Sequence, residues 1–158
     1  AGPAAAATAA VARAAAAPDA GPSRRPALTR AAAEELEGVL VLEFSRPEFQ
    51  ARLHAAWDAT EGNPARQGQA RQDLCLEVQA PIITRYGFEP TYRGVLESVA
   101  AVQNIALTDR DGEDLMEKGR FLSWLCRPDM QRRTPAEDSW HGLLLGLQAH
   151  RHPDGGKK

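Results

Sequence analysis

The chain has 158 residues, a length typical of a single domain that buries a core of its own. Its 43% hydrophobic content overstates that core, because much of it is alanine within the first twenty residues. The net charge of −2 hides an acidic middle, where nine basic residues face sixteen acidic ones between positions 31 and 126. Such a surface repels phosphate backbones, so we expect no DNA partner.

The first 28 residues form a low-complexity arm. They are alanine runs broken by glycine and proline, with almost no larger apolar side chain to bury, so we predict disorder or transient helix. Their richness in alanine and arginine also fits the remnant of an organellar targeting peptide. We therefore expect a cytoplasmic protein, with the chloroplast or mitochondrion as the alternative. The predicted parts are the arm at 1–28, a helical domain at 29–128 and a C-terminal extension at 129–158.

The folded part is predicted to begin at Thr29, which can cap a helix running to about Phe44. Its apolar spacing predicts a buried stripe of Leu36, Val39, Leu40 and Phe44. Residues 45–48 then form a capping-box pattern, in which the Ser45 hydroxyl would accept a hydrogen bond from the backbone N–H of Glu48. The second helix that follows carries one apolar face: Phe49, Leu53, Ala56 and Trp57.

The second helix should stop at Gly62, and Asn63 followed by Pro64 should open the third and longest one, to about Tyr86. Its predicted stripe is Leu74, Val78 and Ile82, flanked by Cys75 and Ile83. Pro81 lies inside this helix and predicts a bend one turn earlier, near Glu77. Gly87 supplies a left-handed stop.

Three further helices complete the predicted bundle. The fourth starts near Thr91, the fifth follows a polar turn at 108–112 and ends before Pro128, and a capping box at 134–137 opens a short sixth helix. The inward residues of the fourth and fifth are Val95, Leu96, Val99, Val102, Ile105, Leu115, Phe121, Leu122, Trp124 and Leu125. No run of alternating β-branched residues suggests a sheet. The fold class is therefore all-α: a compact bundle of about five helices with an Ala-rich arm and an extra C-terminal helix.

The sequence offers no recognisable catalytic, metal or cofactor site. Cys75 and Cys126 lie in apolar helical patterns, which favours buried reduced thiols over a disulfide. The cysteines and histidines lack zinc-ligand spacing, and the acidic turn around Gly112 lacks the first and last ligands of a calcium loop. Nucleophile and phosphate-loop motifs are missing as well. We therefore predict no enzyme activity, no metal and no cofactor, and no apolar run long enough to span a membrane.

The order of helix starts and stops resembles the eukaryotic protein C-ten family (letter C, numeral ten). The matching motifs run from about Leu36 to Pro128: Phe44-Ser45-Arg46-Pro47-Glu48, Tyr86-Gly87-Phe88, Gly94-Val95-Leu96 and a final helix ending near Leu125. These motifs are helix punctuation and core residues. The resemblance implies a small intracellular helical protein of unassigned activity, and hence an interaction role without naming a partner.

These observations predict a protein–protein interaction module or an accessory subunit of a larger, in one alternative organellar, complex. The expected partner-binding residues form an apolar strip in the sixth helix: Trp140, Leu143, Leu144 and Leu147. That strip could instead pack on its own domain. Two other functions stay open: a small enzyme or ligand carrier with a pocket between helices near Pro81, and an RNA-associated organellar factor that uses the basic flanks.

Overall fold

The computed structural model describes residues 27–133. The predicted arm, apart from its last two residues, lies outside this range. So does the predicted sixth helix with its proposed partner-binding strip, which comprises Trp140, Leu143, Leu144 and Leu147. Within the range the chain is helical, and no strand occurs among the described residues. The predicted all-α class is therefore confirmed for this part of the chain.

Six helices make up the described domain. In chain order they are α2 (Arg30–Phe44), α3 (Pro47–Ala59), α4 (Pro64–Thr84), α5 (Tyr92–Thr108), α6 (Glu113–Leu125) and α7 (Pro128–Arg133). Five of them are the bundle helices expected from the sequence. The sixth, α7, has only 6 residues and was not anticipated.

Three helix starts are as the sequence predicts. The hydroxyl of Thr29 accepts a hydrogen bond from the backbone N–H of Ala32 at 3.1 Å, which begins α2. The Asn63 Oδ1 atom accepts from the Arg66 N–H at the start of α4, where Pro64 occupies the first turn. The Thr91 hydroxyl accepts from the Gly94 N–H at the start of α5. Each cap satisfies a backbone donor that the helix leaves without an internal partner.

The predicted capping box at Ser45 is wrong. Arg46 precedes α3 with extended backbone and makes no side-chain cap, while the Ser45 Oγ is buried without a partner among the described residues. The reason is the short connection: the Ser45 N–H still donates to the Val41 carbonyl of α2, so its backbone cannot adopt the extended conformation of a cap. The side chain of Gln50 instead donates to the Phe44 carbonyl at 2.6 Å.

The C-terminus of α4 is closed as predicted. Gly87 has a φ of +84°, and the N–H groups of Gly87 and Phe88 donate to the carbonyls of Thr84 and Ile83. This pair of bonds is a Schellman motif, which only a residue free to adopt left-handed backbone accommodates without strain. Pro81 lies inside α4, and the helix continues across it to Thr84.

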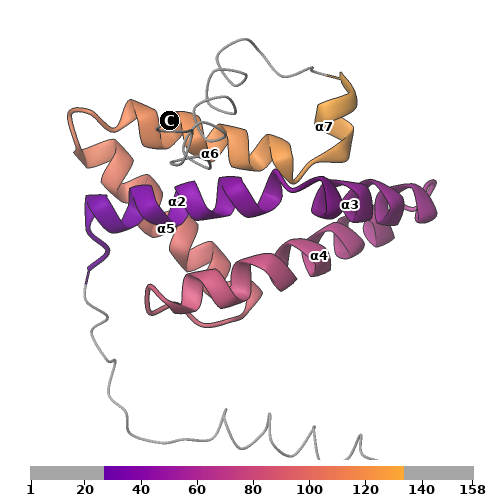
Figure 1. Ribbon diagram of the computed structural model, residues 1–158, viewed down its shortest axis with the longest axis horizontal. Coiled ribbons are helices and arrows are strands. Elements are labelled where there is room, and N and C mark those ends of the chain that lie inside the picture. Colours follow the sequence, from indigo (N-terminus) through magenta and orange to yellow (C-terminus); the bar gives the residue numbers. More distant parts are fainter. Residues whose placement is uncertain (1–26, 134–158) are drawn as a thin grey trace, which may run out of the picture.

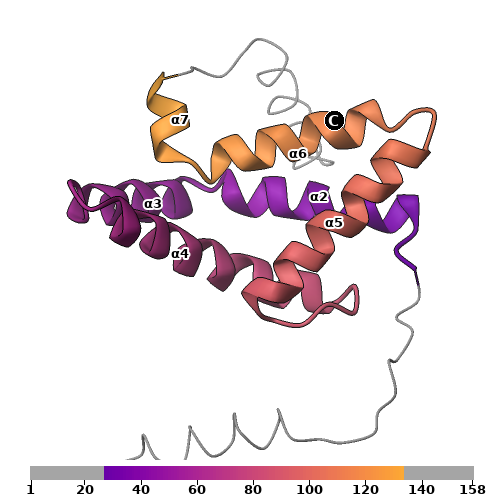
Figure 2. The ribbon, with the colours of Figure 1, turned by 180° about the vertical axis from the view of Figure 1, so that it is seen from behind.

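The bundle is built around α2, which contacts all four of the other long helices (Figures 1 and 2). Helix α6 lies along one side of α2 and α4 lies on the opposite side, while α5 crosses α2 on its way from α4 to α6. Helices α3 and α4 run side by side as a hairpin that projects from the end of α2. The largest fully buried side chains are Phe44, Phe121, Leu36, Leu53 and Ile83.

Polar contacts fasten α7 to the α3 end of the bundle. The Gln131 amide donates to the Trp124 and Leu125 carbonyls at 3.1 and 3.0 Å, and Arg132 pairs with Asp58 of α3 at 2.8 Å. The Trp124 carbonyl also accepts from the Arg127 N–H and the Leu125 carbonyl from the Gln50 side chain, so these bonds join the end of α6 to α7 and α3. The packed body of the domain thus continues past Pro128 to Arg133.

Candidate functional site

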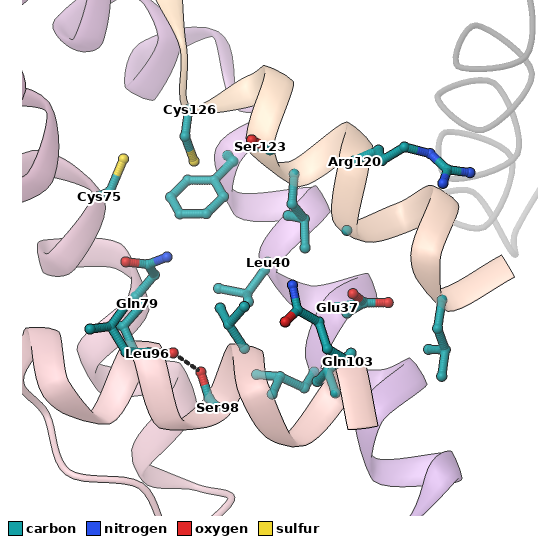
Figure 3. Close-up of a pocket in the computed structure, with 18 of the residues that line it drawn as sticks. Glu37, Leu40, Cys75, Gln79, Leu96, Ser98, Gln103, Arg120, Ser123 and Cys126 are labelled. Atoms are coloured by element: carbon teal, nitrogen blue, oxygen red, sulfur yellow. Dashed lines mark hydrogen bonds between the residues drawn. The ribbon is translucent and has the colours of Figure 1, made fainter. Parts of the chain in front are cut away.

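A groove of about 550 Å³ lies between α5 and α6 (Figure 3). Residues of α2 form its floor, and residues of α4 close one end. Pro81, near which the sequence predicted a pocket, does not line it; the nearest lining residues on the same helix are Gln79 and Cys75, two and six positions earlier. Most of its lining is apolar, as in protein sites that bind organic groups.

The α5 wall carries an apolar stripe that the domain itself does not cover. Tyr92, Leu96 and Val99 line the groove and are 48%, 53% and 45% exposed. Their spacing of four and three residues places them on one helix face. The sequence assigned Leu96 and Val99 to the core, and this assignment is wrong. The core face of α5 is one step around the helix and consists of Gly94, Val95, Ser98, Val102 and Ala106.

The helix α6 supplies the opposite wall. Met116 and Leu122 are half-buried along the groove, and Gly119 lies between them. A Cβ added to Gly119 would lie 3.4 Å from the Oε1 atom of Glu37, with no backbone in its way. A side chain at this position would therefore contact the Glu37 carboxylate on the floor.

Glu37 is the residue that distinguishes the floor. It is 4% exposed, lines the groove, and its Oε2 atom has no hydrogen-bond partner among the described residues. Burial raises the pKa of this carboxyl to about 7, against a smaller opposing attraction from Lys118. Figure 3 shows it on α2 beside Leu40, with Gln103 of α5 nearby.

Sequence inspection missed Glu37, although a signal was present. The position lies four residues after Ala33 and four before Val41, and both of those are fully buried. Helical periodicity therefore places Glu37 within the buried face. The stripe read from the sequence passed through Val39 instead, which is only half-buried.

Two thiols lie at the α4 end of the groove. Cys75 and Cys126 are both buried and unoxidised, as predicted, and Figure 3 shows their sulfurs turned toward each other. Their mutual hydrogen bond, followed by burial, raises the pKa of the Cys126 thiol. The same bond lowers the pKa of Cys75, because it stabilises a negative charge on that sulfur. A neutral, shielded thiol such as Cys126 is a poor nucleophile.

An ionic cluster lies at the turn between α5 and α6, beyond the end of the groove opposite α4. Arg30 of α2 donates to Asp109 at 2.7 Å, to Asp114 at 3.0 Å and to the Asp111 carbonyl at 2.9 Å. The pKa of Asp109 is lowered chiefly by this guanidinium. This acidic turn, which lacks the ligands of a calcium loop, thus joins the two walls, α5 and α6, to α2.

Other site classes find no support in the described part of the chain. Residues 27–133 contain no group of three or more histidine, cysteine, aspartate or glutamate side chains placed to hold a metal ion. None of the helices between Arg30 and Arg133 is both long and apolar enough to cross a membrane. His54, considered as a ligand, instead bonds Gln131 at 3.0 Å.

No protein-family model matches the chain, and neither the curated proteins nor the solved structures contain a match. The resemblance to the protein C-ten family therefore stays a prediction. The function is inferred from the groove alone.

Proposed function

We propose that the protein is a non-enzymatic protein-binding module, acting as an accessory subunit of a larger assembly, and that the groove receives an amphipathic helix of its partner. The observation that supports this most is the stripe of Tyr92, Leu96 and Val99, which is apolar, half-exposed and opposite a second helix. Recognition of a helix in an apolar groove is a recurring mode of protein association.

The dimensions of the groove suit a helix of about three turns. The lining residues span Tyr92 to Ala106 on α5 and, on the other wall, Leu115 to Cys126, which directly follows α6. At about 1.5 Å per residue, the two walls are roughly 20 and 16 Å long. A small-molecule pocket encloses about 70–90% of its ligand, whereas this groove is open along the exposed side chains of α5.

Charge complementarity indicates the character of the partner helix. Between positions 31 and 126 the domain carries nine basic and sixteen acidic residues. A field of this sign attracts basic segments and repels acidic ones during encounter. The partner helix is therefore apolar on the face that enters the groove and basic on its flanks.

Two leucines on α5 provide a matched test. Leu96 is 53% exposed and lines the groove, while Leu107 is 76% exposed and does not. Tagged full-length wild type, Leu96→Glu and Leu107→Glu are compared by native affinity purification and mass spectrometry. We expect partners held in stoichiometric amounts by wild type and Leu107→Glu to be lost from Leu96→Glu. Equal retention by all three would contradict the groove as the docking site.

Further measurements on the full chain distinguish two other candidate occupants of the groove. If the full chain is a dimer by analytical ultracentrifugation and Leu96→Glu makes it monomeric, a second copy fills the groove. If Trp140→Ala with Leu144→Ala in the full chain increases partner capture, residues of the C-terminal extension compete for it. If that double substitution abolishes capture while Leu96→Glu does not, the predicted strip is the docking surface instead.

A ligand carrier is the second candidate, because the volume of about 550 Å³ lies within the usual range for small-molecule sites, roughly 300–1,000 Å³. Native mass spectrometry of the purified full chain tests it. A small molecule that co-purifies with wild type and Leu107→Glu, but not with Leu96→Glu, would favour this function over a docking module.

A further inference from the structure

We infer that the partner helix presents a lysine or arginine to Glu37, and that this buried carboxylate determines which helices the groove accepts. The inference rests on the proposed docking function. It adds the chemistry of recognition: apolar anchors for the walls and one long cationic side chain for the floor.

The first argument is the contrast between Glu37 and its neighbours on α2. Glu34 and Glu43 lie near the surface, and each pairs with an arginine, at 2.9 and 2.7 Å. Glu37 is 4% exposed, yet its Oε2 atom has no partner among the described residues. A buried carboxylate without a donor is costly, so natural proteins retain one where another group completes it. The groove is the side from which such a group can arrive.

The second argument is the surrounding chemistry. The side chains that flank Glu37 on the floor are Leu36 and Leu40, so water is a poor substitute for a donor there. Lys118 attracts the carboxyl, and Arg71 and Arg120 line the groove. None of the three donates a hydrogen bond to the Glu37 Oε2 atom, and the Arg120 guanidinium pairs with Glu113 at 2.8 Å. A lysine or arginine from outside combines an apolar stem, which suits the walls, with a cationic head for the carboxylate.

The third argument is Gly119 of α6, which faces the Glu37 carboxylate without a side chain of its own. A glycine inside a helix costs about 1 kcal/mol relative to alanine. At this position any side chain would begin 3.4 Å from the Glu37 Oε1 atom and would occupy the space through which a cation reaches it. The glycine thus keeps the approach to Glu37 open.

The test uses a display library of amphipathic helical peptides about four turns long. Leucines are fixed at helical spacing on one face and all other positions are randomised. The library is selected against the full chain in three forms: wild type, Glu37→Gln and Glu61→Gln. Glu61 is an exposed residue after α3, remote from the groove, and its substitution makes the same change of charge.

We expect wild type and Glu61→Gln to enrich lysine or arginine at one position of the peptide, and Glu37→Gln to lose that preference. Replacing this residue by methionine in a selected peptide should weaken binding to wild type at least about 30-fold, the usual cost of removing one partner of a buried charge pair. The same replacement should change binding to Glu37→Gln by less than about threefold. Thermal unfolding confirms that the variants are folded.

Two failures are distinguishable. Peptides that bind wild type and Leu107→Glu but not Leu96→Glu, and that show no preference for lysine or arginine, would overturn the role of Glu37 and leave the docking function intact. A selection that yields no peptide sensitive to Leu96→Glu would overturn the docking function as well.

Discussion

Both faces of α5 carry apolar side chains, but they differ in exposure. One face, with Val95, Val102 and Ala106, is buried, and these side chains line the groove from within. The other, with Leu96 and Val99, is half-exposed along the groove. A helix that is apolar on two sides must cover both, and this domain covers only one. The proposed docking function assigns the uncovered face to a contact with another molecule, because large exposed apolar patches are typical of interaction sites.

The largest expected effect is a difference in stability between charge substitutions at two adjacent residues of α5. Val95→Asp places a charge in the core, where Val95 is 6% exposed, and should destabilise the domain by about 3 kcal/mol or more. Leu96→Asp places the same charge at a half-exposed position and should change stability by less than about 0.5 kcal/mol while abolishing helix binding. Urea denaturation and peptide titration measure the two effects. Similar loss of stability in both variants would break the contrast between the faces.

The next effect concerns Glu37, on the floor of the groove, and the dependence of stability on pH. Because folding raises the pKa of Glu37 from 4.5 to about 7, the folded state holds this proton more tightly than the unfolded chain does. The corresponding stability is complete below pH 4.5 and is lost as the pH rises to about 7. Glu37→Gln, which stays neutral, should therefore match wild type near pH 4.5 and exceed it by about 1–3 kcal/mol at pH 8.

Charged groups around the Glu37 carboxyl also influence this pH dependence. Lys118 attracts it and Asp114 repels it, and Arg71 and Arg120 also line the groove. Denaturation at both pH values, with Glu61→Gln as the control, isolates the contribution of Glu37. Equal stability of wild type and Glu37→Gln at pH 8 would show that the carboxyl is already satisfied without a ligand.

A pair of glycines sharpens the comparison further. At Gly94, on the buried face of α5, a Cβ would collide with the Glu89 backbone carbonyl, so Gly94→Ala should cost about 1–3 kcal/mol. At Gly119 a Cβ fits, so Gly119→Ala should stabilise α6 by about 0.5–1 kcal/mol and yet weaken binding of a basic peptide. Denaturation and titration distinguish the two. A Gly119→Ala variant with unchanged peptide affinity would argue that the ligand approaches Glu37 from elsewhere.

The smallest effect concerns the ionic cluster at the turn between α5 and α6. Arg30→Ala removes the contacts that join α2 to Asp109 and Asp114, so the melting temperature should fall modestly, and less in high salt because these ion pairs lie near the surface. Arg93→Ala, which breaks an exposed pair within α5, is the control and should have almost no effect. Equal melting temperatures for the two variants would show that the cluster does not hold the walls.

Much of the fold could be predicted from the sequence, because local chemistry sets helix starts and stops. Thr29, Asn63 and Gly87 act through hydrogen bonds to residues three positions away, so their roles can be predicted from the sequence. The error at Ser45 has a tertiary cause. Only Ser45 and Arg46 separate α2 from α3. Ser45 ends α2 with helical backbone and is therefore unable to cap α3.

The groove could not be predicted in the same way. The sequence shows that Leu96 and Val99 are apolar and lie on one helix face. Only the packing of α5 against its neighbours decides whether that face is covered. Glu37 and Gly119 are 82 positions apart in the sequence and meet only because α6 lies along α2. The single-sequence pattern contains the signal of a buried Glu37 but not the uncovered space beside it.

Hydrogen exchange of the full chain, with and without a selected basic helix, tests the central claim most directly. Backbone amides near the docking site exchange more slowly when a bound helix shields and rigidifies them. We predict new protection concentrated between residues 92 and 103 and between 113 and 126, with little change in α3. Protection confined to α3 and α7, or unchanged exchange along α5 while the peptide is bound, would contradict the groove as the binding site.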